Sequence, residues 1–68
     1  MNFTANQPDR LLRFPAVAEM VGLKTTAIYG AVRRGEFPRP VKFGRASAWP
    51  ESEVLAWIEA RKAERNAA

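Results

Sequence analysis

The sequence contains no cysteine and no histidine among its 68 residues. Their absence excludes disulfides, zinc sites built on these residues, and catalysis by a cysteine–histidine or serine–histidine pair. The sequence has no apolar run of about 18 residues, so it predicts no membrane-spanning helix. It has no Gly-rich phosphate-binding loop either. We therefore expect a single domain with no metal, no cofactor and no membrane association, compatible with a reducing cytoplasm.

Acidic residues are scarce in the middle of the chain. Residues 24–45 contain six lysines and arginines against Glu36 alone, a local charge of +5, whereas the whole chain carries +4. The excess positive charge therefore lies in this middle third. Phosphate backbones attract such a cluster, because cations bound to them release condensed counterions. A solvated basic face without a partner is the alternative interpretation.

The first half of the chain predicts two short helices. Apolar residues at helical spacing, ended by Gly22, predict a helix over residues 15–21. A second helix is predicted over about residues 25–34, with Thr25 or Thr26 as its N-cap. Two short helices joined by a tight turn are the arrangement of a helix-turn-helix.

The second half predicts a hairpin and a third helix. Residues 41–49 alternate apolar and polar side chains around Gly44, which is typical of two short paired strands. Pro50 begins an amphipathic helix that runs to about Arg65. Residues 11–14 are apolar and are expected to be extended or strand-like. The predicted fold is mostly α with a small β-hairpin: a winged helix-turn-helix of three helices and a wing.

The second helix and the hairpin are the candidate binding elements. If Ile28 and Val32 face the core, the opposite face of that helix is free to enter a major groove. The hairpin tip has the shape of a wing for the adjacent backbone or minor groove. The candidate DNA-binding residues are Thr25, Thr26, Tyr29, Arg33, Arg34, Lys42 and Arg45. Alternatively, these are ordinary solvated faces, with Tyr29 half-buried against the hairpin.

Other conspicuous residues are assigned to structure. Trp49 and Trp57 lie at core positions, so we do not expect a platform for stacking single-stranded bases. Gly30 conflicts with the second helix, because an interior glycine costs about 1 kcal/mol relative to alanine. A close approach to DNA or to the first helix would explain it. The last helix carries carboxylates but no nucleophile, so we expect no enzyme activity. These carboxylates belong to Glu51, Glu53, Glu59 and Glu64.

Three stretches of the chain resemble the AlpA-type prophage regulators, a branch of the MerR-like winged-helix superfamily that is related to excisionases. The stretches are RLLRFPAVAEMVGLKTTAIY, RRGEFPRPVKFG and AWPESEVLAWIEAR, and the resemblance covers roughly residues 10–61. It implies transcriptional control in bacteria or their mobile elements, with the second helix as recognition element and the hairpin as wing. It also implies a cytoplasmic, nucleoid-associated protein. The chain departs from the family at Lys24, where serine is usual, and at Gly30, where many members carry arginine or lysine.

The predicted function is sequence-specific regulation of transcription through double-stranded DNA. An excisionase-like architectural factor is the first alternative, and an adaptor that binds an acidic protein is the second. The partners expected besides DNA are further copies of the chain and either an integrase or the transcription machinery. We expect a flexible tail over residues 1–9, a DNA-binding domain over residues 10–65 and a frayed end over residues 66–68.

Overall fold

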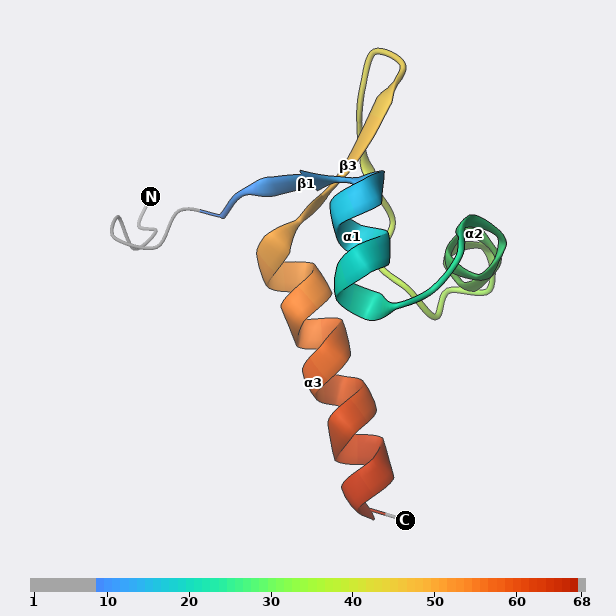
Figure 1. The fold of residues 1–68 in the computed structure, drawn as a ribbon, viewed down its shortest axis with the longest axis vertical. Helices are drawn as coiled ribbons and strands as arrows, with labels where there is room; N and C mark the ends of the chain where they lie inside the picture. Colours follow the sequence, from blue (N-terminus) through green and yellow to red (C-terminus); the bar gives the residue numbers. More distant parts are fainter. Residues whose placement is uncertain (1–8, 68) are drawn as a thin grey trace.

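The computed structural model of the chain describes residues 9–67. The predicted tail therefore lies, up to residue 8, outside the described residues, as does residue 68. Figure 1 shows two short helices and a small sheet packed together, with the C-terminal half of the last helix extending away from them. The elements are β1 (Leu11–Arg13), α1 (Phe14–Val21), α2 (Thr25–Arg33), β2 (Val41–Phe43), β3 (Ala46–Pro50) and α3 (Glu51–Ala67). This confirms the winged helix-turn-helix.

The turn between α1 and α2 is set by one glycine. Gly22 adopts the left-handed conformation at φ 71°, and its N–H donates to the Ala18 carbonyl, which ends α1. This conformation favours glycine because it has no Cβ. The predicted threonine cap is wrong: Lys24 is the N-cap residue of α2, with no hydrogen bond from its side chain. Lysine carries only donors, so it offers nothing to the first N–H groups of the helix.

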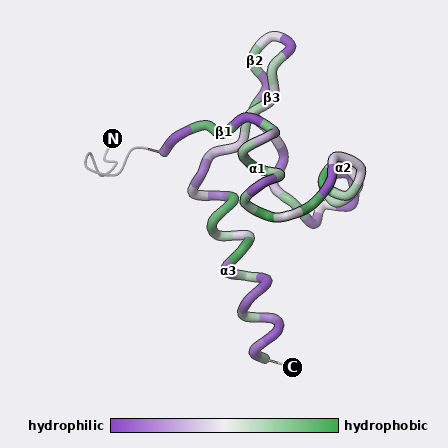
Figure 2. Tube along the Cα trace, viewed as in Figure 1, coloured by the Kyte–Doolittle hydropathy of each residue, from purple (hydrophilic) through white to green (hydrophobic). Residues whose placement is uncertain are grey.

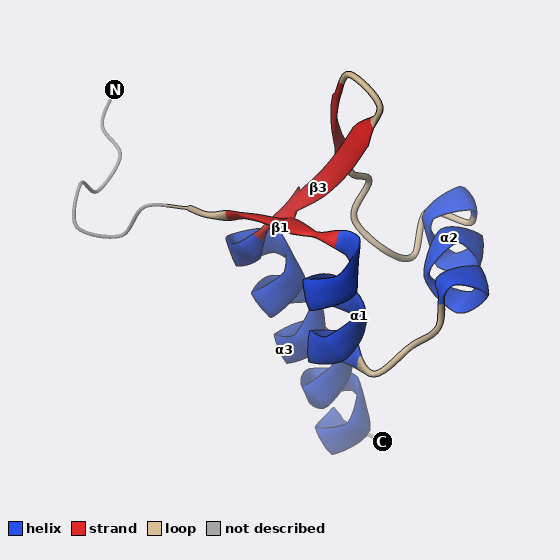
Figure 3. Ribbon diagram, turned by 45° about the horizontal axis from the view of Figure 1, so that its top comes forward, coloured by secondary structure: helices blue, strands red, loops and turns tan. Residues whose placement is uncertain are grey.

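The sheet has three strands in the order β1-β3-β2, and both pairings are antiparallel. The run before α1 is thus a strand, as its apolar pattern indicated, and it pairs with β3, so the two strands of the predicted wing belong to a larger sheet with β3 at its centre (Figure 3). Pro50 is the last residue of β3 rather than the first of the helix, which begins at Glu51. The register pairs Leu12 with Trp49 and Val41 with Ala48.

The core draws one fully buried side chain from each of four elements. Val17, Ile28, Trp49 and Val54 come from α1, α2, β3 and α3 and have no exposed surface. The Trp49 indole N–H donates to the Pro38 carbonyl at 2.7 Å, so its one polar atom is satisfied. Burying each such side chain stabilises the fold by roughly 1.5–3 kcal/mol. The core therefore fixes α2 against the sheet.

Trp57 lies at the edge of this core. It is half-buried, and its indole N–H donates to the Glu36 carbonyl at 2.8 Å. The Arg61 guanidinium lies over its ring, 5.3 Å from the centroid. Both tryptophans therefore pack in or against the core, as predicted.

The second half of α3 leaves the body of the protein. Every residue from 59 to 67 is exposed, and Figure 2 shows this half as mostly hydrophilic. Ion pairs three residues apart, Arg61–Glu64 and Lys62–Glu59, lie along it. No helix among the described residues is long and apolar enough to cross a membrane.

Candidate nucleic-acid interface

The outer face of α2 is built by burying its other face. Ile28 is fully buried and Val32 packs, half-buried, against the core, as predicted. Thr25, Thr26 and Arg33 are consequently exposed. This leaves two hydroxyls in the first turn of α2 and a guanidinium in the last.

Tyr29 differs from the other predicted residues of α2. Its ring stacks on Phe14 with centroids 5.8 Å apart and lies 6.0 Å from the ring of Trp49. It is half-buried, so it does not share the fully exposed face. Of the two placements considered from the sequence, the half-buried one against the hairpin strand is correct.

Arg34 and Gly30 form a local arrangement that the sequence did not reveal. The Arg34 Nε donates to Glu36 Oε1 at 3.0 Å, and both side chains are largely exposed. A Cβ at Gly30 would lie 3.3 Å from Arg34 Nη1. The close approach at Gly30 is thus made by the side chain of Arg34, the C-cap residue of the same helix. It is not made by α1, which was one of the two explanations considered from the sequence.

The wing is the hairpin formed by β2, β3 and the Gly44–Arg45 turn between them. Gly44 has φ 61°, a left-handed conformation that lets the chain reverse within two residues. Lys42 and Arg45 are exposed, and Figure 1 shows the wing protruding from the body. The sequence from residue 37 to residue 50 contains no acidic residue. The wing therefore presents an uncompensated positive charge.

Some of the cations predicted to bind DNA form ion pairs within the protein, and others do not. Among the described residues, the ion pairs involve Arg10, Arg34, Arg61 and Lys62. Arg33 and the wing cations take part in none of them. Phosphate contacts made by those residues would not compete with an ion pair inside the protein.

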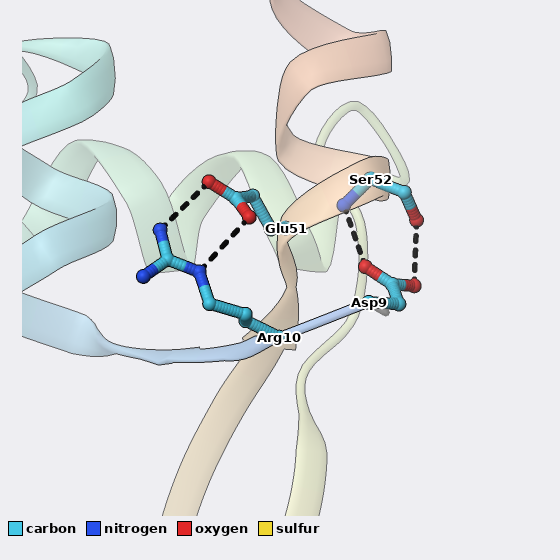
Figure 4. Close-up of polar contacts among 4 residues, drawn as sticks. All are labelled: Asp9, Arg10, Glu51 and Ser52. Carbon is cyan, nitrogen blue, oxygen red and sulfur yellow. Dashed lines mark hydrogen bonds and ion pairs between the residues drawn. The ribbon is translucent and has the colours of Figure 1, made fainter. Parts of the chain in front are cut away.

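A polar clamp at the start of α3 was missed by the sequence interpretation (Figure 4). The Asp9 carboxylate accepts hydrogen bonds from the Ser52 N–H at 2.9 Å and the Ser52 hydroxyl at 2.7 Å. The Arg10 guanidinium donates two hydrogen bonds to the Glu51 carboxylate, from Nε at 3.1 Å and from Nη2 at 3.0 Å. The backbone carbonyl of Arg10 accepts a hydrogen bond from the Glu51 N–H. The clamp ties the residues before β1 to the junction of β3 and α3.

The clamp alters the protonation of its carboxyl groups. The Ser52 N–H, followed by the Ser52 hydroxyl, lowers the pKa of Asp9. The hydrogen bond from Arg10 lowers the pKa of Glu51. Both shifts arise because hydrogen bonds to the ionised carboxylate favour that form. The only sequence signal was a Pro-Glu-Ser-Glu helix start, which does not indicate a partner more than 40 residues away.

Comparison with known proteins bears on this geometry. The family described as "Prophage CP4-57 regulatory protein (AlpA)" matches residues 10–62, most of the chain. The chain belongs to the AlpA family of prophage regulatory proteins. It is also 45% identical over 58 residues to the uncharacterized protein ORF88 of Enterobacteria phage P4. That match covers 84% of the chain and 66%, just under two thirds, of the phage protein's length.

Membership of the AlpA family confirms the resemblance seen in the sequence, and the family is one of prophage regulatory proteins. The part of this AlpA-family chain that the structure describes contains no cluster of three acidic, cysteine or histidine residues that could hold a metal ion.

Proposed function

We propose that the chain regulates transcription by binding double-stranded DNA at specific sequences. In this proposal α2 enters the major groove and the wing lies on the flanking backbone or minor groove. The domain that does so spans residues 10–65. The observation that supports it best is the exposure of Arg33, Lys42 and Arg45 on α2 and the wing, outside every ion pair of the described residues.

The side chains of α2 divide by position into different contacts. Thr25 and Thr26 lie in the first turn of α2. The residues near the N-terminus of a recognition helix are those that contact base edges. Arg33 pairs with a guanine or a phosphate. Because Tyr29 is half-buried, we assign to it only a hydroxyl contact with phosphate.

The open start of α2 adds to these contacts. The first N–H groups of any α-helix have no partner within the helix. In α2 no side chain caps them. A phosphate beside Lys24 and Thr25 would accept these N–H groups and would be favoured by the helix dipole.

Arg34 is the weakest of the proposed contacts. Its guanidinium is already bound to Glu36 at 3.0 Å. A phosphate must replace that carboxylate, so the exchange gains less than a new contact by Arg33. We therefore rank Arg34 below Arg33, Lys42 and Arg45.

Salt-dependent binding of two duplexes tests the proposal. One duplex carries the DNA upstream of the gene for this chain, and the other is a scrambled sequence. We expect tight binding to the upstream duplex that weakens as salt rises, because bound cations release counterions. Arg33→Ala should weaken specific binding roughly 5- to 150-fold if it reads a base. Lys42→Ala should weaken binding to both duplexes by the same factor, and Arg34→Ala should lower the affinity least.

Lys62→Ala is the matched control, because Lys62 is an exposed cation on the far half of α3, paired with Glu59. It should bind as the unchanged protein does. Failure of the unchanged protein to bind either duplex at low salt would refute DNA binding. Binding of an acidic protein that is lost in Arg33→Ala would then support the adaptor.

The excisionase-like alternative uses the same surfaces and differs in its outcome. It predicts that several copies bind side by side next to an integrase site and direct site-specific recombination there. The regulator instead acts on the transcription machinery. One short helix supplies few base contacts, so we propose that either protein acts as a dimer or as adjacent copies. Leu55, 47% exposed on α3, is a candidate contact between copies.

A further inference from the structure

Phe43 is the most exposed large apolar side chain in the described part of the protein. It is 67% exposed, whereas Val41, two residues earlier on the same strand, is 44% exposed. The register explains the difference. β1 ends at Arg13, opposite Ala48, so only the β2 and β3 strands continue to the Phe43–Ala46 pair. Phe43 therefore lies on a two-stranded projection that no other element within residues 9–67 covers.

The surroundings of Phe43 favour a polyanionic partner. Lys42 precedes it, and the turn that follows contains Gly44 and Arg45, both exposed. No carboxylate occurs from residue 37 to residue 50. A protein surface that covered this ring would also have to neutralise both cations, whereas DNA offers phosphates on either side of a groove and an apolar stack of bases within it.

We infer that Phe43 is a wedge that enters the minor groove at the wing and partly unstacks one base step, so that the protein bends its DNA. This inference rests on the proposed DNA-binding function. Apolar side chains at such positions open a base step and bend the duplex by roughly 20–90°. Lys42 and Arg45 flank Phe43 in the sequence, so phosphates bound by these two cations would keep the wing at the groove that the ring enters.

The location of Phe43 gives the wedge a consequence for specificity. Pyrimidine–purine steps unstack and kink most easily. The bound sites should therefore carry such a step where the wing lies, at a fixed distance from the bases read by α2. Specificity at that step arises from the cost of deforming the DNA and needs no hydrogen bond to a base.

Bending and unstacking are measured on a duplex selected from a random library by the unchanged full-length chain. Dyes at the two ends report bending by energy transfer, and 2-aminopurine at the wing step reports unstacking by its fluorescence. We expect the unchanged protein to raise both signals. Phe43→Ala should still bind the duplex through α2 and the wing cations but lose at least half of the rise in each signal.

Two variants separate a wedge from a general effect. Phe43→Leu keeps an apolar wedge and should retain most of the bend, while Val41→Ala removes apolar surface nearer the body and should leave it unchanged. Circular dichroism checks that each variant is folded. Equal bending by Phe43→Ala and the unchanged protein, or tight binding without any bend, overturns the wedge while leaving DNA binding intact. Failure to select any duplex refutes the proposed function itself, and the wedge with it.

Discussion

The two longest helices begin in opposite ways. α3 starts under the polar clamp, in which Asp9 accepts two hydrogen bonds from Ser52 and Arg10 holds Glu51. α2 starts at Lys24, whose backbone is extended and whose side chain makes no capping hydrogen bond. The start of α3 is closed by side chains of the protein itself. The start of α2 is left uncapped, with the positive charge of Lys24 beside it.

We interpret this difference as one between a helix start that supports the fold and a helix start that is available to an anion. Closing a helix N-terminus with a carboxylate stabilises the helix and leaves nothing for an anion to bind. Leaving it open costs stability but keeps N–H groups available for phosphate. In our account α3 supports the sheet and the wing, and α2 binds DNA.

Closing the start of α2 should have the largest effect. Lys24→Asp supplies a side-chain cap and replaces a positive charge with a negative one. We expect helix stability to rise by about 1 kcal/mol. We expect DNA affinity to fall roughly tenfold or more, since the carboxylate repels phosphate where the helix dipole attracted it. Thermal unfolding and a binding titration on one duplex measure both. A variant of equal or higher affinity would show that this helix start does not meet DNA.

Opening the start of α3 should lower stability without altering binding. Asp9→Ala removes both hydrogen bonds to Ser52, so we expect the Tm to fall by several degrees. DNA affinity, measured well below that Tm, should stay unchanged. Glu19→Ala, which removes an exposed carboxylate of α1, is the control and should leave the Tm in place. A weakened affinity in Asp9→Ala would mean that the clamp acts on the DNA-binding surface.

The sequence predicted the elements better than the contacts between them. The helices over 15–21 and 25–34 and the hairpin over 41–49 follow from apolar spacing, Gly22 and Gly44, which are local signals. The clamp joins Asp9 to Ser52, 43 positions apart, and no local pattern indicates that pairing. Even within α2, periodicity alone placed Tyr29 on the outward face. Periodicity does not show that the rings of Phe14 and Trp49 pack against the Tyr29 ring.

Acid should loosen the start of α3 and leave α2 unaffected. The pKa values of Asp9 and Glu51 lie below their usual 3.8 and 4.5 in the folded protein. The unfolded chain therefore binds protons more readily, so the clamp contributes fully above about pH 4.5. Its contribution declines as the pH falls through the lowered values. Thermal unfolding from pH 7 to pH 2 should show this decline, and Asp9→Ala combined with Glu51→Gln should flatten it. An equally steep decline in the double variant would contradict the role of the clamp.

A substitution within α2 should have the smallest effect and sharpen the comparison. Gly30→Ala should stabilise the protein by about 0.5–1 kcal/mol, because alanine loses less conformational freedom in a helix than glycine. The added Cβ would lie 3.3 Å from Nη1, at the flexible end of the Arg34 side chain, which can shift. Chemical unfolding measures the gain. A loss of stability would show that the place of Arg34 over Gly30 matters more than helix propensity.

An NMR titration of the ¹⁵N-labelled chain with its upstream duplex tests the central claim most directly. It follows the backbone N–H of both helix starts and of the wing in one experiment. The account predicts the largest shifts at Thr25 and Thr26 in α2 and at Gly44 in the wing, with little change at Ser52 and Glu53 in α3. Shifts concentrated at the start of α3, with α2 and the wing unchanged, would contradict it.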